Sequence, residues 1–335
     1  MTTGPTFTNR RYLDALDERV LIYDGAMGTS IQKLNLSAAD FGGETFWGCI
    51  DYLVFVKPDA IAEIHRSFLR VGCDVLETDT FRSNRITLRD YKLQDHVIEI
   101  NRAAAQIARQ VANEFSTPTQ PRFVAGSMGP SGMLPSMDDP VLSKITFEEL
   151  AEVFREQAVG LIQGGVDVLL IETSQDLLEA KAAIFGVQRA FAETQQRIPL
   201  QVQVTLDTSG RMLLGTEIGA ALTMLEHLPV DVIGMNCSTG PEHMRVPIQY
   251  LGEFSSRPVA CIPNAGLPLN VDGQAVYPLE PEPFANALLE FVEKNNISVF
   301  RRSSASVVNI TTVANARNLF SLDVFQVPKG TGSGF

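Results

Sequence analysis

Cysteine is scarce in this sequence, and that scarcity limits both how the fold can be stabilised and where the protein works. The 335 residues include only Cys49, Cys73, Cys237 and Cys261. Four cysteines are too few for a disulfide framework in a chain of this length, so we expect reduced thiols and a cytoplasmic location. The first residues also lack the basic and then apolar pattern of a signal peptide.

Positive charge and long apolar runs are lacking as well. The formal net charge is -12, which argues against nucleic acid or an anionic membrane as a partner. No run of about 18 apolar residues occurs, so we expect no membrane-spanning helix. A hydrophobic content of 45% and a charged content of 20% are typical of a globular protein with a large core.

What the sequence does contain is a repeated alternation of short apolar runs with helical patterns. The apolar runs span residues 20–23, 74–77, 123–126, 167–171, 200–206, 231–235, 258–262 and 297–300. They are almost continuously apolar, which indicates strands buried on both faces. Eight strand–helix units predict an α/β fold, a parallel (β/α)₈ TIM barrel, with Asp40–Val56 as a long insertion after the first strand. A doubly wound open sheet is the alternative, but no Gly-x-Gly-x-x-Gly motif follows a strand.

Polar residues gather where these predicted strands end, which is where the active site of a parallel barrel lies. Asp24, Glu77 and Glu172 each stand at the end of an apolar run. Loop formation alone would explain Gly, Asn or Pro at any one strand end, but it does not call for three carboxylates. Because the carboxyl ends of parallel strands share one rim, we expect these residues to converge, and three neighbouring acids imply a cationic ligand.

Six motifs stand in order at the ends of the predicted strands: Asp-Gly-Ala-Met-Gly-Thr (24–29), Glu-Thr-Asp-Thr-Phe (77–81), Gly-Ser-Met-Gly-Pro-Ser-Gly (126–132), Leu-Ile-Glu-Thr (170–173), Gly-x-Asn-Cys-Ser-x-Gly-Pro (234–241) and Pro-Asn-Ala-Gly-Leu-Pro (263–268). In this order they resemble the motifs of the homocysteine S-methyltransferase family, over about residues 12–300. Within that family the chain looks closest to the N-terminal homocysteine-binding module of cobalamin-dependent methionine synthases, because relatives that use betaine or S-methylmethionine tend to have Asp-Gly-Gly at the first motif.

The resemblance implies an enzyme that transfers a methyl group to the zinc-activated thiolate of homocysteine and so forms methionine. It implies zinc as a cofactor, methylcobalamin as the methyl donor on another module, and cobalamin- and folate-binding modules or proteins as partners. Zinc deprotonates a bound thiol outright, and soft sulfur ligands favour it. Cys237 would be the first zinc ligand, although a lone cysteine at a strand end is more often a small buried apolar residue.

The resemblance also implies how homocysteine is held. Its ammonium group would be bound by the three acids, and its carboxylate by backbone N–H groups of residues 25–27 or 127–129. Asn236 would hold its loop or orient the metal ligand. Within their helical patterns, the four histidines are expected to be surface or packing residues. The predicted substrate-binding residues are Asp24, Gly25, Ala26, Met27, Glu77, Ser127, Glu172 and Asn236.

The resemblance ends abruptly near residue 299. The family takes its other two zinc ligands from a Gly-Gly-Cys-Cys-Gly loop directly after strand 8, whereas Arg301–Val308 follows the last predicted strand here and contains no cysteine. We therefore expect a barrel at residues 1–300 with an aberrant last unit, followed by an aberrant segment at 301–335.

A frameshift, truncation or sequence error near Val299–Phe300 would explain this break, and the coding DNA would test it. A non-catalytic or inactive barrel fragment is then the alternative function. An unrelated barrel enzyme such as an aldolase or a phosphate-binding isomerase ranks last, because no predicted strand carries a lysine.

Overall fold

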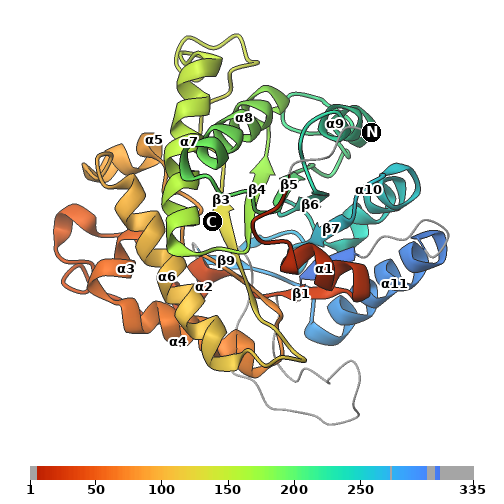
Figure 1. Cartoon of the computed structure of the whole chain (residues 1–335), viewed down its shortest axis with the longest axis horizontal. Helices are drawn as coiled ribbons and strands as arrows, with labels where there is room; N and C mark the ends of the chain where they lie inside the picture. Colours follow the sequence, from red (N-terminus) through yellow and green to blue (C-terminus); the bar gives the residue numbers. More distant parts are fainter. Residues whose placement is uncertain (1–5, 272–273, 300–305, 310–335) are drawn as a thin grey trace.

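The computed structural model describes residues 6–271, 274–299 and 306–309. Eight parallel strands close a barrel in the order β1-β10-β7-β6-β5-β4-β3-β2, and helices encircle it (Figure 1). The predicted (β/α)₈ architecture is confirmed. The barrel strands are β1 (Leu21–Tyr23), β2 (Val75–Glu77), β3 (Phe123–Met128), β4 (Val168–Ser174), β5 (Leu200–Val204), β6 (Val232–Asn236), β7 (Val259–Ile262) and β10 (Ser306–Asn309).

Helices occupy most of the chain between the strands. Thr146 starts one of them with a capping box, because its hydroxyl accepts the Glu149 N–H while the Glu149 carboxylate accepts the Thr146 N–H. Within the described residues no helix is both long and apolar enough to span a membrane. The helices are α1 (Arg11–Glu18), α2 (Met27–Gln32), α3 (Leu53–Val56), α4 (Pro58–Arg70), α5 (Arg85–Leu88), α6 (Val97–Phe115), α7 (Phe147–Gly164), α8 (Leu177–Thr194), α9 (Ile218–Glu226), α10 (Pro241–Phe254) and α11 (Pro281–Val299).

The eighth barrel strand lies further along the chain than the sequence predicts. Residues 297–299 continue α11, so the predicted strand at Ile297–Phe300 is wrong. Instead β10 closes the barrel, pairing Val307 with Leu21 of β1 and Ser306 with Val259 of β7. Two adjacent β-branched valines suit a strand there. The residues that follow β10 lie outside the described part of the chain, and the sequence has no cysteine after Cys261.

Side chains fill the barrel interior and separate it from the helical shell. Alternate strand residues such as Leu170 and Phe123 face inward, whereas Leu169 packs against the surrounding helices. The inward group includes Tyr12 of α1, whose hydroxyl donates to Gln201 Oε1 at 2.7 Å and lies 2.8 Å from the Tyr23 hydroxyl oxygen. The interior is thus a packed core, and a ligand cavity can form only at the strand ends.

Three aspartates tie neighbouring strands together where the strands begin. Asp74, Asp167 and Asp231 precede β2, β4 and β6, and each carboxylate accepts a backbone N–H from the neighbouring strand region, namely that of Ile22, Val124 and Leu200 at 2.8–3.0 Å. Each aspartate also pairs with arginine. Because these groups lie at the opposite end of the strands from the cavity, their role is to stabilise the barrel and not to take part in a reaction.

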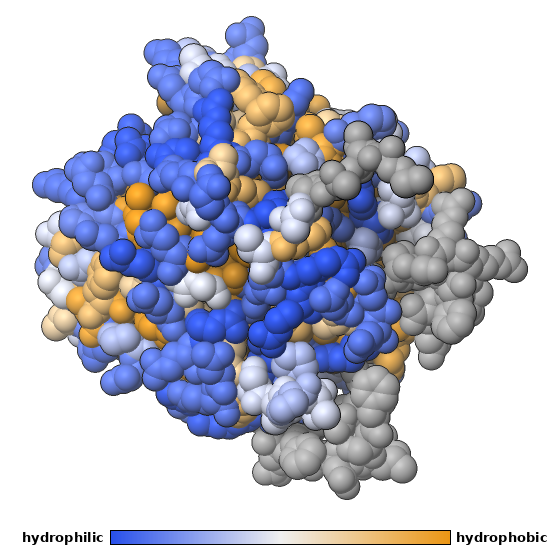
Figure 2. Space-filling view, in the orientation of Figure 1, coloured by the Kyte–Doolittle hydropathy of each residue, from blue (hydrophilic) through white to orange (hydrophobic). Residues whose placement is uncertain are grey.

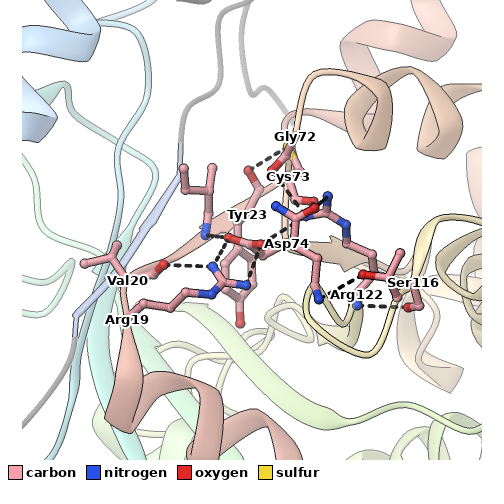
Figure 3. Close-up of polar contacts among 11 residues, drawn as sticks. Arg19, Val20, Tyr23, Gly72, Cys73, Asp74, Ser116 and Arg122 are labelled. Atoms are coloured by element: carbon pink, nitrogen blue, oxygen red, sulfur yellow. Dashed lines mark hydrogen bonds and ion pairs between the residues drawn. The ribbon is translucent and has the colours of Figure 1, made fainter. Parts of the chain in front are cut away.

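Asp74 makes the fullest of these networks (Figure 3). Its two oxygens accept two hydrogen bonds from Arg19, both at 2.8 Å, and a third from Arg122 Nη1 at 3.0 Å. Arg122 is only 7% exposed, and it also donates to the Cys73 carbonyl at 2.7 Å. The carboxylate is therefore a buried junction between β1, β2 and the segment that enters β3.

Figure 2 shows that the molecular face seen in Figure 1 is mostly hydrophilic, with apolar residues in small patches.

A separate antiparallel pair, β8 (Leu269–Val271) and β9 (Gln274–Val276), lies outside the barrel sheet. This pair follows β7 directly, so it belongs to the loops at the carboxyl ends of the barrel strands. The cavity described next lies at those strand ends.

Candidate functional site

The carboxyl ends of the barrel strands line a cavity of about 470 Å³. It is large enough for more than one small ligand group, since ligand pockets commonly measure about 300–1,000 Å³. Of the nine predicted site residues only Asp24 does not line it. The predicted residues that do are Gly25, Ala26, Met27, Glu77, Ser127, Glu172, Asn236 and Cys237.

Glu172, at the end of β4, is the centre of a hydrogen-bond network in this cavity. Its Oε1 accepts the Ser127 hydroxyl at 2.5 Å, and its Oε2 accepts Asn236 Nδ2 at 2.8 Å. Burial raises the pKa of Glu172 to about 7, and the two hydrogen bonds oppose that rise. A carboxyl group with a pKa near neutrality is partly protonated, and a cationic ligand beside it would favour its charged form.

Asn236 fixes the ends of β4 and β6 relative to each other. Its Oδ1 accepts the Thr173 N–H at 2.8 Å, and its Nδ2 lies 3.4 Å from Cys237 Sγ. Thr173, Cys237 and Ser238 all have left-handed backbone conformations, with φ of +57°, +56° and +60°. Such conformations cost roughly 1 kcal/mol or more each in non-glycine residues, and they persist where surrounding contacts hold them. Here they turn Cys237 toward the cavity.

Cys237 and Glu77 complete the polar end of the cavity. Burial, with Glu172 nearby, raises the pKa of the Cys237 thiol to about 12, so the thiol is neutral as it stands. Burial, together with the charges of Glu172 and Asp24, holds the pKa of Glu77 well above its usual range. Its Oε1 has no hydrogen-bond partner within the described part of the chain. A cationic ligand bound here would offset the electrostatic cost of these two carboxyls.

Asp24 lies behind this cavity rather than in its wall. Its Oδ1 accepts the Glu77 N–H at 3.0 Å, and its Oδ2 lies 3.7 Å from Nδ1 of His65 on α4. The carboxylate thus joins β1 to β2 at the cavity's edge. Its predicted contact with the substrate ammonium stays a prediction.

A model of the homocysteine S-methyltransferase family matches residues 21–300. The chain belongs to this family. Over 309 residues it is 40% identical to the methionine synthase of Mycobacterium tuberculosis, which covers 89% of this chain and 25% of that protein. Over 287 residues it is 42% identical to the methionine synthase of Mycobacterium leprae, covering 86% and 23%. The chain therefore spans about a quarter of the length of these curated relatives.

Solved structures show the same barrel. The homocysteine methyltransferase MmuM from Escherichia coli, in its metallated form, matches with a TM-score of 0.66 over 90% of this chain and 94% of that one. Its oxidised form matches with a TM-score of 0.65. Both are 18% identical in sequence to this chain, so this likeness concerns the fold alone.

The residues of this homocysteine S-methyltransferase family member do not fit a three-thiolate zinc site. Cys237 points to the cavity, but across residues 6–271, 274–299 and 306–309 no three His, Cys, Asp or Glu side chains lie close enough to hold a metal. Cys261 is buried in β7 with its Sγ 4.0 Å from Met244 Sδ, away from the cavity lining. Cys49 also lines the cavity, and burial raises the pKa of its thiol to about 12.

The outer wall of the cavity carries acids that the sequence does not single out. Asp51, from the insertion after β1, accepts the Ser83 hydroxyl at 2.5 Å, and Asp79 follows β2. Burial raises the pKa of both carboxyls. Asp79 lies within the Glu-Thr-Asp-Thr-Phe motif, so its position was the available signal. Nothing local in the sequence places Asp51 beside it.

A second buried glutamate, Glu179 on α8, lies outside the cavity and anchors the loop after β3. Its Oε1 accepts both the N–H and the hydroxyl of Ser131, at 2.8 Å and 2.5 Å. Burial raises its pKa from 4.5 to about 7. A raised carboxyl pKa means that stability is lost as the pH rises from about 4.5 through about 7, since the unfolded chain ionises first.

Replacing Glu179 with Gln is expected to remove this loss. The amide oxygen can still accept both bonds from Ser131, but no charge is buried. The difference between 4.5 and about 7 corresponds to about 3 kcal/mol, so the variant should be more stable than the parent by up to that amount at pH 8. The gain should be much smaller at pH 5. Urea unfolding of both proteins at the two pH values measures it, and an equal difference at both would contradict the burial of an ionised Glu179.

Proposed function

We propose that this barrel binds L-homocysteine in the cavity and presents its thiol for methylation to methionine, in the cytoplasm, where its four free cysteines stay reduced. One observation carries the proposal. Asn236 Nδ2 contacts both Glu172 Oε2, at 2.8 Å, and Cys237 Sγ, at 3.4 Å. Asn236 thus holds both the carboxylate that would bind the ammonium group of homocysteine and the cysteine that would lie near its sulfur. Family membership supports the same substrate.

The ammonium group of homocysteine pairs with Glu172 and Glu77 in this proposal. Glu172 is buried and Glu77 is half-buried at the cavity, and a bound cation would offset the electrostatic cost that raises their pKa values. Asp24 then supports Glu77 from behind through the Glu77 N–H. The acids therefore divide into two that face the ligand and one that orders the strand ends.

The carboxylate of homocysteine is assigned to the backbone of residues 25–27. The competing group, residues 127–129, has already spent two N–H donors: Ser127 N–H binds Thr78 Oγ1 at 3.0 Å, and Gly129 N–H binds the Phe81 carbonyl at 3.0 Å. Ala26, which precedes α2, has no side chain that could accept from the first turn of that helix. Backbone N–H groups there are suited to an anion.

Methylcobalamin, carried by a cobalamin-binding module, is the proposed methyl donor, and a folate-binding module is the proposed source of its methyl groups. The support is the 40% identity to a methionine synthase. Zinc is the proposed activator in the family, where it would deprotonate the homocysteine thiol. Cys237 would supply one thiolate to it. The sequence has no cysteine after Cys261, so the family's other two cysteine ligands are absent.

That shortage favours a second candidate, a barrel that binds homocysteine without turning it over. A single thiolate cannot complete a tetrahedral site that keeps one position for the substrate. The two candidates share the amino-acid site and differ in zinc and in turnover. The coding DNA near Val299–Phe300 separates the two candidates. A frameshift there would mean that residues 301–335 replace the family's zinc loop in this sequence alone.

The experiment that tests the proposal measures zinc, homocysteine binding and methionine formation on the purified chain. Bound zinc near one per chain, with methionine formed from methylcobalamin, supports the enzyme, and Cys237→Ala should then abolish both without lowering the melting temperature. Cys261→Ala is the matched control and should retain zinc. Homocysteine binding without zinc supports the second candidate. A chain that binds no homocysteine at millimolar concentration would refute both.

A further inference from the structure

His65 is a buried histidine for which the proposed reaction has no use. It lies on α4, outside the barrel, and is 0% exposed. Within the described residues neither ring nitrogen has a hydrogen-bond partner at ordinary distance. Its helix neighbours Ile61 and Ile64 belong to an apolar cluster. An unpaired polar ring in such surroundings costs roughly 1–3 kcal/mol, so the contact it does make needs an explanation.

The carboxylate of Asp24 faces this ring, with its Oδ2 3.7 Å from His65 Nδ1. The gap exceeds a hydrogen bond by less than 1 Å. Of the two neutral forms of the ring, only the one protonated on Nδ1 can donate to this oxygen. The other would set a nitrogen lone pair against the carboxylate. The imidazole of His65 also lowers the pKa of Asp24, against the rise that burial causes.

Asp24 carries this contact onward to the cavity. Its backbone N–H donates to the Val75 carbonyl at 2.9 Å, and its Oδ1 accepts the Glu77 N–H at 3.0 Å. Glu77 lines the cavity with an Oε1 that lacks a partner among the described residues. A continuous path of contacts therefore runs from α4 through the end of β1 to a cavity carboxyl on β2.

We propose that His65 is a positioning residue, which donates its Nδ1–H to Asp24 and thereby fixes the strand end that aims Glu77 at the ligand's ammonium group. The second part rests on the proposed function, while the hydrogen bond itself does not. His65 does not touch the cavity, so it acts only through Asp24. The other three histidines are not suited to this role: His96 and His227 are exposed, and His243 is half-buried on α10, the helix that follows β6.

Nitrogen-15 NMR of histidine-labelled full chain tests the hydrogen bond directly. His65 is assigned by the signal that His65→Asn removes. We expect a ring protonated on Nδ1, and we expect Asp24→Ala to move it to the Nε2–H form. A neutral Nε2–H ring in the parent chain, or a ring that ignores Asp24→Ala, would overturn the proposal. This readout needs neither zinc nor homocysteine.

A substitution series tests the positioning role. The amide nitrogen of Asn can take the place of Nδ1, whereas that of Gln lies near Nε2. His65→Asn should keep the Kd for L-homocysteine within about threefold, whereas His65→Gln and His65→Leu should weaken it at least tenfold. His227→Asn is the matched control at an exposed histidine. Equal loss in Asn and Gln variants would reduce His65 to packing, and a parent chain that binds no homocysteine would refute the proposed function while the NMR result stands.

Discussion

Replacing Glu172 with Gln is expected to weaken the binding of L-homocysteine by about 10-fold to 150-fold. Gln keeps the size of the side chain and an oxygen for the Ser127 hydroxyl, but it removes the negative charge that would meet the ammonium group and the acceptor for Asn236 Nδ2. Hydrogen bonds to a charged group are worth about 1.5–3 kcal/mol, and each 1.4 kcal/mol is a tenfold change in Kd. Calorimetric titration at pH 8, above the pKa of about 7, measures the effect.

Glu179→Gln provides the matched control for this experiment. Glu179 is buried like Glu172, and its pKa is also raised to about 7, but it lies outside the cavity. Its replacement should leave the Kd for homocysteine unchanged while altering stability. An unchanged Kd in Glu172→Gln would remove Glu172 from the ammonium site. A similar loss of affinity in both variants would show that the effect comes from a general change in the structure and not from contact with the ligand.

Replacing Asp74 with Ala is expected to destabilise the barrel by about 3–5 kcal/mol, because removing one partner of a buried ion pair leaves the other uncompensated. Arg122 would stay buried at 7% exposure without its carboxylate. Arg19 and the Ile22 N–H would lose the same acceptor. The change in the free energy of unfolding, measured in urea, gives the effect.

Asp14→Ala is the matched control for the buried junction. Asp14 also pairs with an arginine, Arg10, but both side chains are about half exposed, at 56% and 48%. Exposed pairs contribute about 0–1 kcal/mol. If Asp74→Ala cost no more than Asp14→Ala, the three-aspartate arrangement at the start of the strands would not be a source of stability. Homocysteine affinity should be unaffected in the folded fraction of either variant.

The barrel could be predicted because its signals are local. Apolar runs such as Val168–Ile171 are short and continuous, and each is followed by polar residues within the same few positions of the chain. Parallel strands bring such ends to one rim, so Glu77, Glu172 and Cys237 could be grouped without any distance. The six ordered motifs then gave the family.

The misplaced eighth strand shows where local signals compete. Ile297–Phe300 is apolar and short enough for a strand, yet residues 297–299 also continue the helical stretch that begins at Pro281. Apolar runs of this length do not separate a strand from the end of a buried helix. Ser306–Asn309 forms the eighth barrel strand because it pairs with β1 and β7. That pairing is a tertiary contact, which a local sequence pattern does not show.

Contacts between distant parts of the chain had no sequence signal. His65 and Asp24 lie on separate elements, and only the packing of α4 against the barrel brings their side chains together. The same holds for Asp51 and Asp79, which reach one cavity wall from the insertion and from the end of β2. Asp24 follows β1 as predicted, but nothing in its motif says that its carboxylate accepts the Glu77 N–H instead of lining the cavity.

The double contact of Asn236 would make the site select its ligand by the length of the ligand's side chain. One amide group holds the carboxylate of Glu172 and the sulfur of Cys237 at a set separation, and the left-handed turn at residues 237 and 238 leaves little slack. In the proposed complex, homocysteine would span that separation from its nitrogen to its thiol. Cysteine is one methylene shorter than homocysteine, a difference worth about 1–3 kcal/mol in a fitted pocket. Selection between these two metabolites would then be set by a residue that need not bind either.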